Sequence, residues 1–461
     1  MDLPAPNRSP GMKLLLALLV GAVLTIPLFA VYLLVYDRQS QSETARSSIA
    51  EGWGGPQTLA GPLLVIPYAL PVTETVQENG KPVTRTSVQR RQLFIAPDTL
   101  DLDTRINPER RTRSIYESVV YDADISGSAS FRLPPDAARI VDLATLEYDK
   151  AELRFGVADP RGLKPANRIT IDGQPAPAQP GNGVAATGGS GFFANLDASA
   201  LRERPLTAKF AFALRGHSVV ALAPRAGATR WTVTSPWQHP SFTGGFLPEA
   251  RNVTASGFSA TYRISNLALG TTLVTTSDSP ADSREPQPAY DSRSPTVAPS
   301  SAAQVGLIQP VDLYAQVNRS VKYGFLFIGF TFMAFLLFDV VAGVRVSAVE
   351  YLLVGAALVL FFVLLLAFAE VIGFTPAYLV AAGGVIALLT AYSGAVLGSR
   401  RRAGFIAGLL VALYGVLYIL LSLEAYSLLI GSLLLFAALA AVMYLTRNLD
   451  WSGRSADPSE T

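Results

Sequence analysis

The stretch that decides the fold is YLLVGAALVLFFVLLLAFA, residues Tyr351–Ala369, which holds no charged side chain. A helix in an aqueous protein core seldom exceeds about 14 consecutive apolar residues, whereas a bilayer needs about 20. Similar stretches surround it, so the region 323–445 is almost wholly apolar and is interrupted only by short turns, three arginines and a few single carboxylates. The chain is therefore predicted to be an integral membrane protein.

Working outward, the apolar region 323–446 divides into a predicted C-terminal bundle of five transmembrane helices: Tyr323–Phe338, Tyr351–Ala369, Ala377–Leu397, Gly404–Leu421 and Ser427–Leu445. Another apolar run, Leu14–Val35, is long enough to cross a hydrocarbon layer of roughly 30 Å. A cleaved signal peptide is the alternative, but its apolar core is about 7–15 residues long and precedes a small-x-small cleavage site. This run is longer and leads into Tyr36-Asp37, so residues 1–36 are predicted to hold a cytosolic tail and an uncleaved anchor helix.

Basic residues predict the orientation of the spans. Arg345 lies between the first two C-terminal spans, Arg400, Arg401 and Arg402 lie between the third and fourth, and Arg447 follows the last. The turns on the opposite side carry no Lys or Arg, so the positive-inside rule places both termini, including the tail 447–461, in the cytoplasm. The long block between the anchor and the bundle is then exported.

The exported block, residues 37–275, is predicted to be a mainly-β domain, because short β-prone runs alternate with Pro, Gly, Asn and Asp. Many short strands without long helices between them favour a sandwich or an open barrel. A Ser/Pro-rich stretch, 276–304, predicts a flexible linker, and residues 305–322 form a juxtamembrane segment. A second such stretch, 173–190, predicts a long loop within the β domain.

Composition excludes several classes of function. The chain has 37 Lys and Arg against 35 Asp and Glu without a basic stripe, so no nucleic acid partner is expected. It has no cysteine, which removes disulfides and thiolate metal sites. The two histidines, His217 and His239, lie outside any zinc motif, and no nucleophile elbow or phosphate loop occurs. We therefore expect no metal, no cofactor and no catalytic residue.

Carboxylates at the rims of the spans are candidates for an intramembrane function. They are Asp339, Glu350, Glu370 and Glu424. Charge is costly in lipid, so such groups face a bundle interior, a partner or water. An ion path or ligand site would use Glu370 and Glu424, whereas a structural role would use the carboxylates to orient helix ends. Glu370 is the one to test first, because Phe368, Ile372 and Phe374 surround it.

Several strings of residues resemble the CreD family of bacterial inner-membrane proteins. In the exported block they are Gly55-Pro56-Gln57, Arg111-Thr112-Arg113-Ser114-Ile115-Tyr116 and Ser235-Pro236-Trp237-Gln238-His239-Pro240-Ser241-Phe242. In the membrane they include Glu350-Tyr351-Leu352-Leu353-Val354-Gly355 and Tyr444-Leu445-Thr446-Arg447-Asn448-Leu449-Asp450-Trp451. The resemblance implies a multi-pass protein of the bacterial inner membrane with a periplasmic domain, associated with cell-envelope integrity and, in some bacteria, with β-lactam stress. It supplies no catalytic residues.

Trp237, His239 and Phe242 are the candidate partner-binding residues, because Trp and His beside a Pro-stiffened turn suit a contact surface. The structural alternative is a buried aromatic plug that closes the β domain. The leading hypothesis is a non-enzymatic protein whose β domain binds another envelope protein or a cell-wall component, with the bundle holding it in the lipid bilayer. A small transporter or channel and an envelope hydrolase are the competing hypotheses.

Overall fold

The computed structural model describes residues 10–78, 81–278, 301–308, 313–341, 347–396, 398–422 and 427–447. It divides into two compact units, which we call the membrane unit (Met1–Glu43 and Val311–Thr461) and the β unit (Thr44–Pro310). The helix α1 (Pro10–Trp53) begins in the first and ends in the second. The predicted flexible linker lies mostly outside the described residues.

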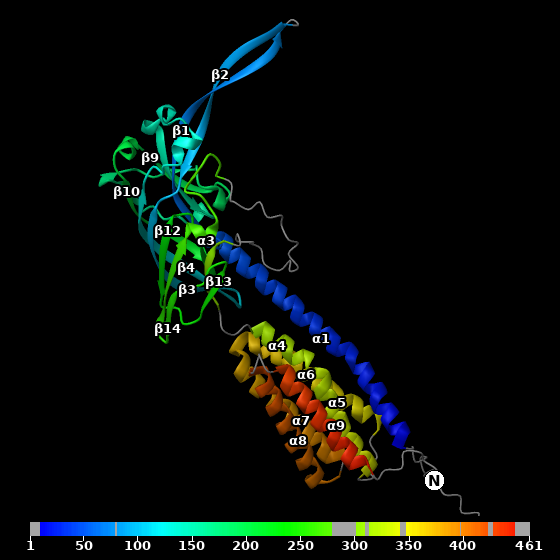
Figure 1. Cartoon of the computed structure of the whole chain (residues 1–461). Helices are drawn as coiled ribbons and strands as arrows, with labels where there is room; N and C mark the ends of the chain where they lie inside the picture. The colour runs from blue at the N-terminus through cyan, green and yellow to red at the C-terminus, as the bar shows by residue number, and fades with distance from the viewer. Residues whose placement is uncertain are drawn as a thin grey trace, which may run out of the picture. The chain divides into compact units, whose positions relative to one another are not determined.

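Helices make up the membrane unit, coloured blue for α1 and yellow to red for the rest in Figure 1. Besides α1 they are α4 (Leu313–Lys322), α5 (Gly324–Val341), α6 (Ala348–Ile372), α7 (Phe374–Val396), α8 (Arg400–Ser422) and α9 (Ser427–Thr446). Four helices of the described part have the length and apolar composition to span a bilayer: Gly11–Trp53, Ala348–Ile372, Phe374–Val396 and Arg400–Leu421. The prediction of a membrane protein with an N-terminal apolar helix is confirmed. That α5 and α9 also span the membrane stays a prediction.

The start of α6 explains one of the rim carboxylates. The hydroxyl of Ser347 accepts a hydrogen bond from the backbone N–H of Glu350 (3.3 Å), and the Glu350 carboxylate accepts one from the backbone N–H of Ser347 (2.6 Å). This capping box satisfies two backbone donors that a helix start leaves without intrahelical partners. Glu350 therefore has a structural role at a helix end.

Two sheets pack face to face in the β unit, which confirms the mainly-β prediction in its sandwich form. Within the described residues the first sheet runs β13 (Pro240–Gly244), β17 (Ala303–Leu307), β11 (Val219–Ala223), β1 (Gln57–Glu78), β5 (Ala151–Val157), β9 (Gly191–Leu196) and β8 (Gln179–Pro180), with β2 (Lys81–Ile95) beside β1 and β16 (Val274–Thr275) beside β2. The second runs β14 (Ala250–Thr254), β15 (Gly257–Ser265), β12 (Ala228–Ser235), β3 (Thr99–Arg113), β4 (Tyr116–Phe131), β10 (Leu206–His217), β6 (Arg168–Ile171) and β7 (Gln174–Pro175). Short helices lie between the strands along the chain: α2 (Ala137–Ile140), α3 (Asn266–Leu269), η1 (Leu143–Thr145), η2 (Tyr148–Lys150), η3 (Pro160–Gly162), η4 (Ala185–Thr187) and η5 (Ser199–Arg202).

The hydrophobic core lies between the sheets, because alternate residues of each strand point inward. Phe155 of the first sheet meets Phe210 of the second edge to face, with ring centroids 5.1 Å apart. Trp231 is fully buried and stacks on Tyr262, with centroids 5.0 Å apart. Aromatic contacts of this kind contribute about 0.5–1.5 kcal/mol each beyond the area they bury.

Two features of the β unit were not predicted from the sequence. The strand β17 pairs with β11 and β13, so residues on both sides of the boundary between the predicted linker and the juxtamembrane segment belong to the first sheet. The strands β1 and β2 remain paired from Leu64 and Ile95 out to Glu78 and Lys81 and project as a two-stranded ribbon (Figure 1). A ribbon of this length is not apparent from the short apolar runs Leu63–Ile66 and Gln92–Ile95.

The end of α1 is anchored within the β unit. The indole N–H of Trp53 donates to the carbonyl of Tyr121 (3.4 Å), and the guanidinium groups of Arg111 and Arg215 each lie 4.5 Å from the Trp53 ring. Cation–π contacts of this geometry are attractive by about 0.5–2 kcal/mol. The last turn of α1 is therefore a fixed part of the β unit.

Candidate functional site

The segment Trp237–Phe242, predicted to bind a partner, follows the end of β12 and includes the first residues of β13. Ser235, the last residue of β12, accepts a hydrogen bond through its hydroxyl from the backbone N–H of Trp237 (3.2 Å). The indole N–H of Trp237 donates to the carbonyls of His239 (3.1 Å) and Ile308 (3.0 Å). These bonds hold the segment against the chain that follows β17.

The two aromatic residues of this segment are partly buried and pack against the core. The ring of Phe242 meets Phe258 edge to face at 5.8 Å, and the guanidinium of Arg110 lies 5.6 Å from the Trp237 ring. The side chain of His239 is exposed. These contacts favour the structural alternative for Trp237 and Phe242, while partner binding by Trp237, His239 and Phe242 stays a prediction.

A polar groove of about 370 Å³ lies directly beside this segment. Strands β3, β12, β14 and β15 supply its lining, together with the turn between the last two. Hydroxyl and amide side chains predominate in it, and it contains one cation: Arg105, Asn107, Thr234, Ser235, Pro236, Asn252, Thr254, Ser256, Gly257, Phe258 and Ser259.

Strand register aligns four of these residues in one row across the sheet. Arg105 is the partner of Thr234, Thr234 of Ser259, and Ser259 of Asn252. Directly opposed residues of neighbouring strands share a face, with the strands about 4.8 Å apart. We call Arg105, Thr234, Ser259 and Asn252 the polar row.

The side chains of the polar row form no hydrogen bond or ion pair with other described residues. Three other arginines of the same sheet form ion pairs: Arg230 with Asp101 (3.5 Å), Arg263 with Glu249 (3.3 Å) and Arg215 with Asp122 (3.8 Å). The nearest acidic residue in register with Arg105 is Asp124, which accepts a hydrogen bond from Asn107 (3.4 Å) instead. The row therefore presents polar groups that are available to a ligand.

These residues have no distinctive signal in the sequence. Each is an ordinary polar residue at an outward position of a strand, and β3 is far along the chain from β12, β14 and β15. The alternation of Thr232, Val233 and Thr234 signals an outward-facing hydroxyl, but it carries no information about the neighbouring strand.

A serine–histidine pair bears on the hydrolase hypothesis. The hydroxyl of Ser118 lies 2.7 Å from Nε2 of His217, and the hydroxyl of Ser218 lies 3.0 Å from Nδ1. Ser118 is only 2% exposed, however, so no substrate reaches its hydroxyl. Burial, together with the nearby Arg46 guanidinium, lowers the pKa of the His217 imidazole and favours its neutral form. The arrangement is that of a structural hydrogen-bonded pair.

Glu370 lies near the end of α6, and its carboxylate accepts a hydrogen bond from the hydroxyl of Tyr314 on α4 (3.1 Å). The bond joins the amphipathic helix α4 to the end of a membrane-spanning helix. It supports the view of Glu370 as a helix-end residue. Glu424, the other candidate carboxylate, lies outside the described residues.

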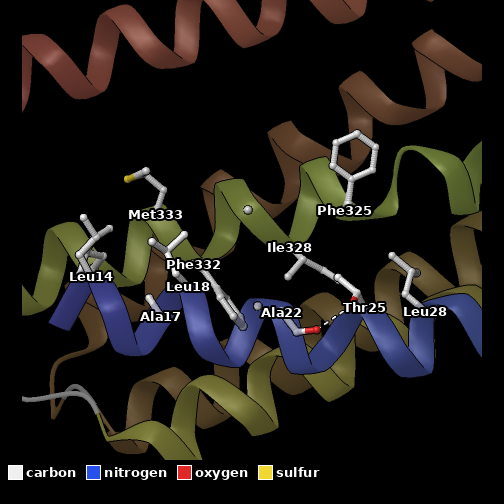
Figure 2. A pocket seen from close by; sticks show the side chains of 13 residues that line it. Leu14, Ala17, Leu18, Ala22, Thr25, Leu28, Phe325, Ile328, Phe332 and Met333 are labelled. Carbon is white, nitrogen blue, oxygen red and sulfur yellow. Dashed lines mark hydrogen bonds between the residues drawn. The ribbon is translucent and has the colours of Figure 1, made fainter. Parts of the chain in front are cut away.

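The membrane unit also contains an apolar groove of about 330 Å³ between α1 and α5. Figure 2 shows Leu14, Leu18 and Leu28 of α1 lining it opposite Phe325, Ile328, Phe332 and Met333 of α5. Thr25 contributes a hydroxyl, which donates to the carbonyl of Ala22 one turn earlier (2.6 Å), the dashed line in Figure 2. This groove suits lipid or apolar side chains and offers an ion no convergent set of ligands.

Comparison with known proteins covers almost the whole chain. The family model described as "Inner membrane protein CreD" matches residues 9–452. The Inner membrane protein CreD of Escherichia coli (strain K12) is 33% identical over 444 residues, which include 94% of this chain and 92% of that protein. The similarity thus extends over both the membrane unit and the β unit.

Proposed function

This chain belongs to the CreD family of inner membrane proteins, and we propose that it maintains cell-envelope integrity by binding an envelope component through its β unit. The component is another envelope protein or part of the cell wall. The observation that carries the proposal is the polar groove beside Trp237–Phe242, whose row of side chains is available on the surface of a domain with a complete core of its own. The membrane-spanning helices hold this domain in the lipid bilayer, and the proposed function is not enzymatic.

We also propose that the β unit is periplasmic and that both termini are cytoplasmic. The support is the distribution of basic residues: Arg400, Arg401 and Arg402 begin α8, and Arg447 follows α9, whereas the turn between α6 and α7 carries no Lys or Arg. Cytoplasmic loops are enriched in Lys and Arg in membrane proteins.

Reporter fusions test this orientation. Alkaline phosphatase needs disulfides, which form in the periplasm, so a fusion at Gly181 should be active and a fusion at Ser399 should be inactive. A fluorescent protein that matures in the cytoplasm should give the opposite pattern at the same two positions. If Gly181 reported the cytoplasm and Ser399 the periplasm, the whole orientation would be wrong.

Variants of the full chain separate binding by the β unit from transport through the membrane unit. In a strain that lacks its own relative of this protein, sensitivity to envelope stress is the measurement. We expect Gln238→Ala with His239→Ala, two exposed positions, to lose protection, because they alter the surface beside the groove. Glu370→Gln and Glu424→Gln should retain it. Loss of protection in the carboxylate variants alone, with normal membrane insertion, would favour transport.

A further inference from the structure

We propose that the polar groove binds an anionic saccharide, a sugar chain of the envelope that carries a carboxylate or a phosphate. This inference rests on the proposed function and names the class of ligand for its binding surface. It is drawn from the chemistry of the lining, the availability of its side chains and the geometry of the polar row.

The lining provides the groups that a sugar needs. Hydroxyl side chains donate and accept hydrogen bonds, and amide side chains present donors and an acceptor together. The groove combines five hydroxyls, from Thr234, Ser235, Thr254, Ser256 and Ser259, with the amides of Asn107 and Asn252. Sugar hydroxyls are themselves both donors and acceptors, so a surface of mixed polarity satisfies them in several orientations.

Part of this polar lining is already used within the protein. Ser235 accepts a hydrogen bond from Trp237, Asn107 donates to Asp124, and the hydroxyls of Thr254 and Ser256 lie 2.9 Å apart. The polar row differs, since its side chains are engaged with no other described residue. Several polar side chains of the lining are thus bonded within the protein, whereas those of the polar row are accessible.

Charge points to an acidic ligand. Arg105 is the only charged residue among those that line the groove, and no carboxylate lies within ion-pair distance of it in the described part of the chain. A guanidinium presents a planar fork that matches a carboxylate or a phosphate bidentately. A groove lined by one cation together with hydroxyl and amide groups is complementary to a sugar that carries one acid group.

The shape of the site suits a chain. The polar row crosses four adjacent strands, so from Asn252 to Arg105 it spans three strand spacings, roughly 14 Å. The groove is open to solvent rather than an enclosed cavity. An elongated ligand lying across the strands would meet Asn252, Ser259 and Thr234 in turn and place its acid group at Arg105.

Calorimetric titration of the purified full-length protein in detergent micelles tests the proposal. The probes are an oligosaccharide of uronic acids, a phosphorylated oligosaccharide and a neutral oligosaccharide of the same length. At least one acidic probe should bind at least ten times more tightly than the neutral one. Added salt should weaken the binding of that acidic probe. The two acidic arms distinguish a carboxylate from a phosphate ligand.

Arg105→Gln should lower the affinity for the acidic probe at least tenfold and remove the preference for it over the neutral probe, without lowering the melting temperature. Arg230→Gln is the matched control, because Arg230 is an exposed arginine of the same sheet outside the groove. Unchanged binding of the acidic probe in Arg105→Gln, or equal affinity of the parent protein for neutral and acidic probes, would overturn the inference.

The same variants in the envelope-stress assay distinguish the two proposals. If Arg105→Gln loses protection while the parent binds no acidic saccharide, the ligand class is wrong and the proposed function stands. If Arg105→Gln loses saccharide binding and still protects the envelope, the saccharide site is supported and its role in envelope integrity is refuted.

Discussion

Trp231→Ala should destabilise the β unit by about 3–5 kcal/mol, the usual cost of removing a large aromatic side chain from a packed core. Trp231 is 0% exposed, and its stacking partner Tyr262 is also fully buried. The substitution also removes the bond from the indole N–H to the hydroxyl of Thr104 (3.0 Å), which is 1% exposed and would be left without that partner. Against a typical total stability of about 5–15 kcal/mol, this loss is large.

Thermal unfolding followed by near-ultraviolet circular dichroism of the full-length protein measures this effect. Trp237→Ala is the matched control, since it removes the same side chain from a partly buried position at the edge of the core. We expect a clearly smaller loss for the control. Equal losses in the two variants would contradict the placement of Trp231 at the centre of the sandwich.

Gly216→Ala should strongly destabilise the β unit, although the substitution adds only one methyl group. A Cβ at Gly216 would overlap the phenol oxygen and Cζ of Tyr121 and lie 2.7 Å from its Cε2. Tyr121 is 0% exposed and its hydroxyl donates to the carbonyl of Val219 (2.7 Å), so the ring has little freedom to move aside. Overpacking of this kind costs about 1–3 kcal/mol and occasionally more.

The melting temperature and the yield of folded protein check this second prediction. Gly306→Ala is the control, because it adds the same methyl group in a strand where the nearest atom, Cβ of Ser241, lies at an ordinary 3.5 Å. The control should change stability little. A Gly216→Ala protein as stable as the control would mean that Tyr121 packs elsewhere.

The elements that the sequence predicted well are those whose burial follows from a local pattern. The predicted spans Tyr351–Ala369, Ala377–Leu397 and Gly404–Leu421 coincide with α6, α7 and α8 to within a few residues at each end. An apolar run needs no partner to be recognised, because lipid is its solvent. Apolar runs such as Phe210–Leu214 likewise fall within strands of the core.

Strands with a less apolar sequence were missed or divided. Tyr116–Tyr121 and Gly127–Leu133 are two separate β-prone runs in the sequence, but a single strand, β4 (Tyr116–Phe131), covers the first run and most of the second. The middle of β4 alternates Asp122, Ala123, Asp124 and Ile125. That alternation of exposed and buried residues matches a strand with one face in water. The parallel pairing of β3 with β12 is not predictable from either strand, because it joins segments more than a hundred residues apart.

In the candidate site, too, some residues are recognisable from the local sequence and others only from the tertiary structure. Trp237, His239 and Phe242 are recognisable from residue type and turn chemistry alone, and the structure shows that Trp237 and Phe242 pack against the core. The polar row consists of residues that are unremarkable one by one, and register between four strands makes them neighbours. Glu370 was identified by its apolar surroundings, but its partner Tyr314 follows only from the packing of α4 on α6.

By itself, the sequence determined that this protein belongs in a membrane, which segments are apolar enough to cross it and that a long β-rich block stands between them. Those conclusions depend on transfer of side chains between water, lipid and protein, which each segment undergoes largely on its own. Only the tertiary structure decided how the strands pair, that the core lies between two sheets and that Arg105, Thr234, Ser259 and Asn252 share one face. Pairing and register depend on contacts between distant segments, and local sequence does not encode which segments meet.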